Sequence, residues 1–276
     1  MIIFLMILIL VLALFYWNAV AGGYWPFDGM ALTDTGVFGD SWGAFTSIFS
    51  ALGFCGVLWT IKLQIDATKK LEKDAIKKEE FERIRDFETS FFNMLNLLQI
   101  IIKDMRIESG DLKSKREGRS VVMYFYLKFK RRVTNKLSLT SLGVDDLKDV
   151  DIEYERERLQ NEYDIYFLDR SGNLSHYYRF LYNIFKFIHD AKIDDGAKQK
   201  YAKILRAQIS NYELLILFYN GKSKHGEKFE KYFKEYAVFD NLPVYKLCSN
   251  AHVLFYSREC WGANSDAIDI ISIFEG

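Results

Sequence analysis

Residues 2–21 read IIFLMILILVLALFYWNAVA, and residues 42–61 read WGAFTSIFSALGFCGVLWTI. As a helix rising about 1.5 Å per residue, each uncharged run is long enough to cross a hydrocarbon core of about 30 Å. No Lys or Arg occurs in the first 61 residues, and the basic residues begin at Lys62. Because basic residues accumulate on the cytoplasmic side of membrane segments, we predict a transmembrane hairpin over residues 1–61 with both chain termini in the cytoplasm.

The first run has an alternative interpretation as a secretory signal peptide, since Ala19-Val20-Ala21 resembles a cleavage site. The run lacks a positively charged start and is longer than the usual apolar part of a signal peptide. A second apolar run then follows and is stopped by basic residues. Asp40 or Ser41 can cap a helix that starts near Trp42. We therefore favour two spans, of about 2–21 and 42–61, joined by an outer loop at 22–41.

Small residues recur every fourth position at the start of the second run, at Gly43, Ser47 and Ala51. This spacing lets two helix backbones approach closely in a bilayer. It fits packing of one span against the other, or a homo-oligomer interface. The lipid bilayer is the first partner that the sequence predicts, and a second copy of the chain is another.

A long helix is predicted for residues 62–106, which contain no helix breaker. Residues 66–86 are dense in charged side chains. Apolar residues follow steps of three and four along the segment, as on one face of a helix. They include Ala67, Leu71, Ala75, Phe81, Ile84, Phe87, Phe91, Leu95, Leu98 and Ile102. We interpret the segment as a stalk helix, which could also pair with a second copy as a coiled coil.

Residues 107–276 are predicted to form a cytoplasmic all-α domain, because their apolar residues keep the helical period. All 37 basic and 34 of the 37 acidic residues follow residue 61, so this part is nearly neutral and does not attract nucleic acid in bulk. The three cysteines have no metal-ligand spacing. We predict no metal and no cofactor, and we assign no role to residues 246–276.

Several blocks of the chain resemble, in order, the putative phage abortive infection protein family of bacterial membrane-anchored proteins. The blocks are GDSWGAFTSIFSALGFCGVLWTIKLQ at 39–64, FETSFFNMLNLL at 87–98, Gly118-Arg119, LSHYYRFLYNIFKFI at 174–188, YAKILRAQISNYELLILFYN at 201–220 and KYFKEYAVFDNL at 231–242. The resemblance covers most of residues 38–245. It implies a two-span membrane protein of bacterial antiviral defence. As a hypothesis beyond the resemblance, we expect a protein of the inner membrane whose helical body senses a phage-derived or host signal, with a phage protein or RNA as candidate triggers.

Polar residues share faces of two helices in these blocks. His176, Arg179 and Asn183 lie on one face of the first helix, at positions i, i+3 and i+7. Arg206, Ser210 and Glu213 lie on one face of the next. A carboxylate within NYELLILFY must be paired or protonated, because burying it alone is costly. We expect Arg179 or Arg206 as the partner of Glu213. The group is either a polar network that fixes helix packing or a binding site.

One enzyme signature is present. Arg170, five residues and His176 resemble the Arg–x(4–6)–His motif of HEPN-type ribonucleases. In that motif the His activates a ribose hydroxyl and the Arg steadies the phosphate, without a metal.

The sequence thus favours an antiphage defence protein that senses infection through a cytoplasmic helical domain and arrests or kills the host cell. A membrane-tethered ribonuclease using Arg170 and His176 is the alternative from a different class. A non-toxic structural membrane adaptor is the third hypothesis.

Overall fold

The computed structural model describes residues 2–22, 24–25, 28–29, 32–108, 115–137 and 151–275. The chain separates into two compact units, Met1–Glu80 and Phe81–Gly276. Helices dominate both units, which confirms the predicted all-α class. The exception among the described residues is a short hairpin of two strands.

The first unit holds helix α1 (Ile2–Gly22) and the first part of helix α2 (Leu32–Asp104). Helix α1 coincides with the first predicted span. Helix α2 starts earlier than predicted, so the proposed cap at Asp40 or Ser41 is wrong: both residues lie inside the helix. The glycines in this stretch do not end it, since each costs a helix only about 1 kcal/mol.

Helix α2 contains the second predicted span and the predicted stalk without interruption. From Thr46 onward it is long and apolar enough to cross a membrane, judged by length and composition, and it is the one such helix among the described residues. Its apolar side chains in this part are exposed, as at Leu52 and Phe54. A surface of this kind is typical of a segment that a bilayer or a partner covers.

The end of α2 belongs to the second unit and supplies part of its core. Phe87, Phe91, Leu95, Leu98 and Ile102 are buried along one face, at the predicted helical spacing. Earlier members of the same stripe are not, since Leu71 is 69% and Phe81 is 73% exposed. The stripe is therefore a core face only where other helices of this unit cover it.

A two-stranded hairpin follows α2, at the start of the region for which the sequence predicts only helices. Strands β1 (Arg106–Glu108) and β2 (Lys115–Glu117) are antiparallel, with Arg106 opposite Glu117. Gly118 then takes a positive φ of 61° and donates its N–H to the Met105 carbonyl at 2.9 Å. A residue without Cβ adopts this conformation readily, and here it directs the chain into the next helix.

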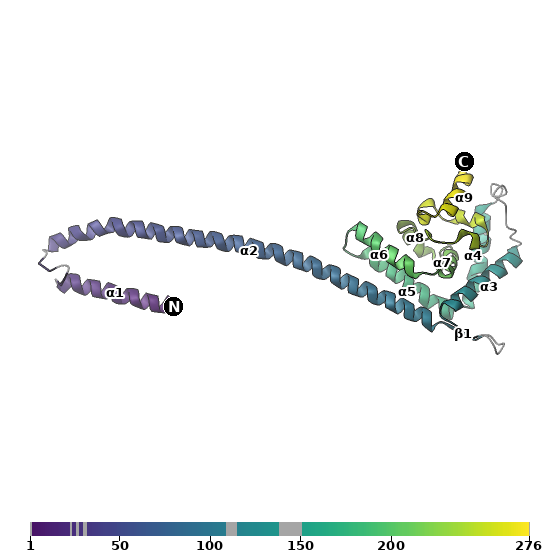
Figure 1. Ribbon diagram of the computed structural model, residues 1–276, viewed down its shortest axis with the longest axis horizontal. Helices are drawn as coiled ribbons and strands as arrows, with labels where there is room; N and C mark the ends of the chain where they lie inside the picture. Colours follow the sequence, from purple (N-terminus) through teal and green to yellow (C-terminus); the bar gives the residue numbers. More distant parts are fainter. Residues whose placement is uncertain are drawn as a thin grey trace. The chain divides into compact units, whose positions relative to one another are not determined.

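The helices of the second unit gather into one body (Figure 1). They are α3 (Arg119–Leu137), α4 (Ile152–Leu168), α5 (Ser171–Asp190), α6 (Asp195–Gln208) and α7 (Asn211–Asn220). Two begin at aspartate caps: Asp151 accepts the N–H of Tyr154, and Asp194 accepts that of Ala197. Helix α7 is buried from Glu213 to Asn220 and packs against α3 and α4. It is the central helix of the core.

The C-terminal segment adds short helices around this core. They are η2 (Glu227–Phe229), α8 (Glu230–Glu235), η3 (Val244–Lys246), η4 (Asn250–Phe255), η5 (Arg258–Trp261) and α9 (Ser265–Glu275). Trp261 is fully buried, and α9 packs against η4 and η5. Residues 246–276, which sequence patterns left without a role, therefore contribute to the core of the body.

Buried tyrosine hydroxyls join elements that are distant in the sequence. Tyr166 donates to the Phe125 carbonyl at 2.6 Å, and Tyr256 donates to the Phe218 carbonyl at 2.7 Å. The hydroxyls of Tyr163 and Tyr178 lie 3.1 Å apart. Burial raises the pKa of all four phenols well above the usual value. These bonds satisfy polar atoms inside an aromatic core.

Candidate functional site

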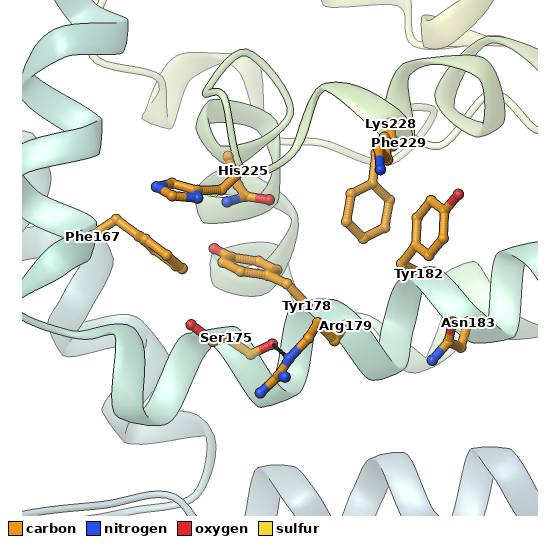
Figure 2. Close-up of a pocket in the computed structure, with 10 residues that line it drawn as sticks. Phe167, Ser175, Tyr178, Arg179, Tyr182, Asn183, His225, Lys228 and Phe229 are labelled. Atoms are coloured by element: carbon orange, nitrogen blue, oxygen red, sulfur yellow. Dashed lines mark hydrogen bonds between the residues drawn. The ribbon is translucent and has the colours of Figure 1, made fainter.

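A pocket of about 650 Å³ lies between helix α5 and the segment that follows helix α7 (Figure 2). Helix α5 forms one wall, the chain from Asn220 to Phe229 forms the other, and α4 contributes one ring. The lining residues are Phe167, Ser175, Tyr178, Arg179, Tyr182, Asn183, Asn220, His225, Lys228 and Phe229. Aromatic rings, cationic groups and side-chain amides therefore meet in one cavity.

The aromatic side chains form two groups in this pocket. Phe167, Tyr178 and His225 gather at one end, and Tyr182 and Phe229 at the other (Figure 2). The His225 and Phe167 rings lie 4.9 Å apart at an angle of 32°. Tyr182 and Phe229 meet edge to face at 5.4 Å. Because Tyr178, Phe167 and Phe229 are themselves buried, the walls are held in place by the core.

The charged side chains of the lining are Arg179 and Lys228, and His225 adds an imidazole ring. The Nε of Arg179 donates to the Ser175 carbonyl at 3.2 Å, within its own helix. Among the described residues, neither Arg179 nor Lys228 forms a salt bridge, and no carboxylate belongs to the lining. Asp164 stands outside the lining, near His225, and burial raises the pKa of its carboxyl group.

Asn220 provides a polar group at the base of the pocket. Its residue is 1% exposed, and its side-chain oxygen and nitrogen have no hydrogen-bond partner of standard geometry among the described residues, although the Tyr163 hydroxyl is close to it. Leaving a buried amide unpaired costs about 1–3 kcal/mol. Such a group in a cavity is typical of a site that a ligand completes.

A tight turn follows Asn220 and carries His225. Ser223 donates its hydroxyl to the Asn220 carbonyl at 2.7 Å. A Cβ on Gly226 would lie 2.1 Å from that same carbonyl oxygen, so no other residue fits here without rearrangement. The turn therefore depends on glycine at position 226 and places His225 opposite α5.

The predicted polar residues do not form one network. Arg179 and Asn183 line the pocket, as their shared helix face suggests. Ser210 and Glu213 instead form a capping box at the start of α7, where the Ser210 N–H donates to the Glu213 carboxylate at 2.5 Å. The first pair thus lines the pocket on α5, and the second pair caps the start of α7.

Glu213 has a different cation from the one the sequence suggests. Its carboxylate is fully buried, and Oε1 lies 3.9 Å from the Nε of Arg119. Arg119 also donates to the Gln208 carbonyl at 2.8 Å. Arg119 begins α3 directly after the positive-φ glycine, which explains how a distant segment reaches this helix end. The expected partners Arg179 and Arg206 are wrong.

Arg206 holds the chain that follows α8. It donates to the Tyr236 carbonyl at 2.8 Å, to the Ala237 carbonyl, and to Asp240 at 3.2 Å. Ala237 has a φ of 44°, which a non-glycine residue rarely adopts. Helix α8 therefore ends at Glu235, and Arg206 binds the carbonyls that the end of the helix leaves free.

The proposed catalytic pair lies at the start of α5. The Arg170 guanidinium covers the ring of Tyr166 at 4.0 Å and forms an ion pair with Asp169 at 3.1 Å. Arg170 lines a separate cavity of about 340 Å³ together with Arg106 and Tyr124. His176 is exposed, and no hydrogen bond between described residues joins it to Arg170. Their catalytic role stays a prediction.

The structure also reveals a buried polar cluster that the sequence did not suggest. The Tyr219 hydroxyl accepts the Cys248 N–H at 2.8 Å and lies 3.0 Å from Nδ1 of His252. Burial lowers the pKa of His252 to about 3 and raises the pKa of the Cys248 thiol to about 11. Lys130 donates to the nearby Leu247 carbonyl at 2.7 Å. No spacing pattern links these residues, because they come from three separate elements.

Among the described residues, no group of three or more His, Cys, Asp or Glu side chains is arranged to hold a metal ion.

The segment that carries most of the pocket is similar to a described protein family. Residues 170–247 match the family model described as putative phage abortive infection protein. The resemblance predicted from the sequence is confirmed over this segment, and it suggests a role in phage abortive infection. All lining residues of the pocket except Phe167 lie within it. No curated protein and no solved structure matches the chain.

Proposed function

We propose that this protein is an antiphage defence protein of the abortive-infection type, anchored in the bacterial inner membrane with both termini in the cytoplasm. The observation that carries the proposal is the family match over the pocket-bearing segment. The exposed apolar part of α2 and the absence of basic residues before Lys62 support the anchoring.

In this proposal the helical body senses infection and the membrane segments take part in the response. The pocket between α5 and residues 220–229 is the site for the signal, because it offers binding groups that the body itself leaves unpaired. The response arrests growth or kills the infected cell, through membrane segments that assemble. Gly43, Ser47 and Ala51 supply a face of small side chains for such an assembly.

Membrane anchoring is tested by paired substitutions along α2. The variant Leu52→Arg/Val57→Arg places two charges in the apolar part, where each Arg costs about 2.5–3.5 kcal/mol near the middle of a span. The control variant Leu71→Arg/Ile76→Arg makes the same change at exposed positions of the charged part of the helix. We expect the first variant to leave the membrane fraction and to lose phage resistance, measured as plating efficiency, and we expect the control to retain both.

The outcomes separate the parts of the proposal. If the Leu52→Arg/Val57→Arg variant is soluble and protects as well as the wild type, the membrane role is wrong. If the wild-type chain gives no protection over a broad panel of phages, the defence role is wrong.

The two alternatives have their own readouts. His176 is exposed, so His176→Ala should leave the fold intact. Full protection by this variant would remove the ribonuclease alternative, and loss of protection with normal folding would support it. Overexpression without phage tests the adaptor alternative, because a non-toxic adaptor leaves growth unaffected.

A further inference from the structure

We propose that the pocket between α5 and residues 220–229 binds a free nucleoside phosphate, an aromatic anion small enough for one cavity. The inference rests on the proposed function, in which the body senses a signal, and it names the chemical class of that signal. Three properties of the pocket carry it: ring faces, an unpaired amide and unpaired cations.

The ring faces suit a planar base. Phe167, Tyr178 and His225 gather at one end of the cavity (Figure 2), and burial in the core holds the Phe167 and Tyr178 rings in place. Bases stack well on such rings because every base has a π face. An aliphatic ligand could fill the cavity, but it could not stack on these rings.

The amide of Asn220 suits the edge of a base. It offers one acceptor and two donor hydrogens, and both of its polar atoms lack a partner of standard geometry among the described residues. The edge of a base presents donors and acceptors side by side, so it can satisfy this amide at both atoms. A purely apolar ligand would leave the amide unpaired at a high cost.

The cations suit a phosphate. The hydrogen bond from Arg179 to the Ser175 carbonyl uses Nε, so among the described residues the two terminal nitrogens of Arg179 form no ion pair. Lys228 lies across the cavity from α5 and has no salt bridge among the described residues. Arg binds phosphate oxygens in a forked geometry, and Lys adds a mobile charge. Because the lining contains no carboxylate, it does not repel an anion electrostatically.

The size of the site favours a small ligand over a nucleic acid chain. A volume of about 650 Å³ falls within the roughly 300–1,000 Å³ of small-molecule pockets. Binding a strand requires a basic groove that follows its backbone. The chain carries equal numbers of acidic and basic residues, which provides no such general attraction.

The test uses the purified full-length chain in detergent and isothermal titration calorimetry. The ligands are the mono- and triphosphates of the four common nucleosides, the nucleosides alone and inorganic phosphate. We expect at least one nucleotide to bind at least about tenfold more tightly than its nucleoside, because charge-assisted hydrogen bonds to the phosphate are lost without it. It should also bind more tightly than phosphate, because the base contributes.

Matched variants locate the site. Arg179→Gln/Lys228→Gln should weaken nucleotide binding by about tenfold or more. The control Arg131→Gln/Lys203→Gln removes the same charges at exposed positions outside the pocket and should bind as the wild type does. Equal weakening in both variants, or none in the first, would overturn the assignment.

Two further results would overturn the proposal. One is the absence of heat and of thermal stabilisation with every nucleotide. The other is binding of a short single-stranded RNA while all mononucleotides fail. Because these measurements use purified protein without phage, they can fail while plating assays still show protection, so the ligand class and the defence role are tested separately.

Discussion

The buried carboxylate of Glu213 allows a quantitative test of how α7 is held. Glu213 caps the helix by accepting the Ser210 N–H, and it lies 3.9 Å from an Arg119 side chain that is 48% exposed. Gln can form the same capping box, since the motif accepts Glu or Gln at this position. The two substitutions Glu213→Gln and Glu213→Ala therefore separate the cap from the charge.

The expected magnitudes differ between the two variants. Glu213→Ala loses the cap, worth about 1 kcal/mol, and leaves a void and an unpaired N–H that cost about 1–3 kcal/mol. We expect a loss of about 2–4 kcal/mol in the free energy of unfolding. Glu213→Gln loses an ion pair to a half-exposed partner, worth about 0–1 kcal/mol after screening by solvent. It also removes the cost of burying a charge, so we expect a change below about 1 kcal/mol.

Thermal unfolding followed by circular dichroism measures both variants. A change of 1 kcal/mol shifts Tm by about 2–4 °C for a body of this size, so the Ala variant should lose roughly 4–16 °C and the Gln variant less than about 4 °C. Ser210→Ala is the control, because it removes the other half of the capping box. If Gln destabilises as much as Ala does, the charge rather than the cap holds α7, and this reasoning is refuted.

Two further predictions concern other buried groups. The pKa of His252 is lowered to about 3 in the folded state, while the unfolded chain binds a proton near pH 6.5. Stability should therefore fall as pH decreases from 6.5 toward 3, by about 2.3 kcal/mol between pH 6.5 and 4.5 from this group. Urea unfolding at several pH values should show a flatter profile for His252→Gln, and an unchanged profile would show that His252 is not the group responsible. Arg206→Lys should lower Tm by several degrees, since one ammonium group cannot replace a guanidinium that binds two carbonyls and Asp240. Asp240→Asn should cost less, because the two carbonyl bonds remain, and the reverse order in thermal melting would contradict this account.

Local patterns in the sequence predict the helices but not how far each is buried. The apolar stripe of α2 is regular, and Phe87, Phe91 and Leu95 are buried as its spacing suggests. Phe81 continues the same stripe and is exposed. Period alone reports which residues share a face, and it does not report where along the helix other elements cover that face.

The candidate site shows a similar limit. The shared face of Arg179 and Asn183 is visible from their spacing, and both line the pocket. Lys228, His225 and Asn220 lie some forty residues later, after α6 and α7, so no local spacing connects them to α5. Separation in the sequence also explains why the partner of Glu213 is not predicted. Arg119 begins α3, far before Glu213 in the chain, and only the three-dimensional packing brings the two together.

The internal phenols have a consequence for alkaline conditions. Burial raises the pKa of Tyr163, Tyr178 and Tyr256. Their hydroxyls form hydrogen bonds between α4 and α5 and between α7 and the residue that follows η4. A phenol whose pKa is higher in the folded state keeps its proton until the protein unfolds. In strong base, deprotonation of these tyrosines and unfolding of the body should therefore occur together. The near-ultraviolet absorption of phenolate would then rise abruptly rather than gradually, giving the molecule a built-in optical reporter of its own denaturation.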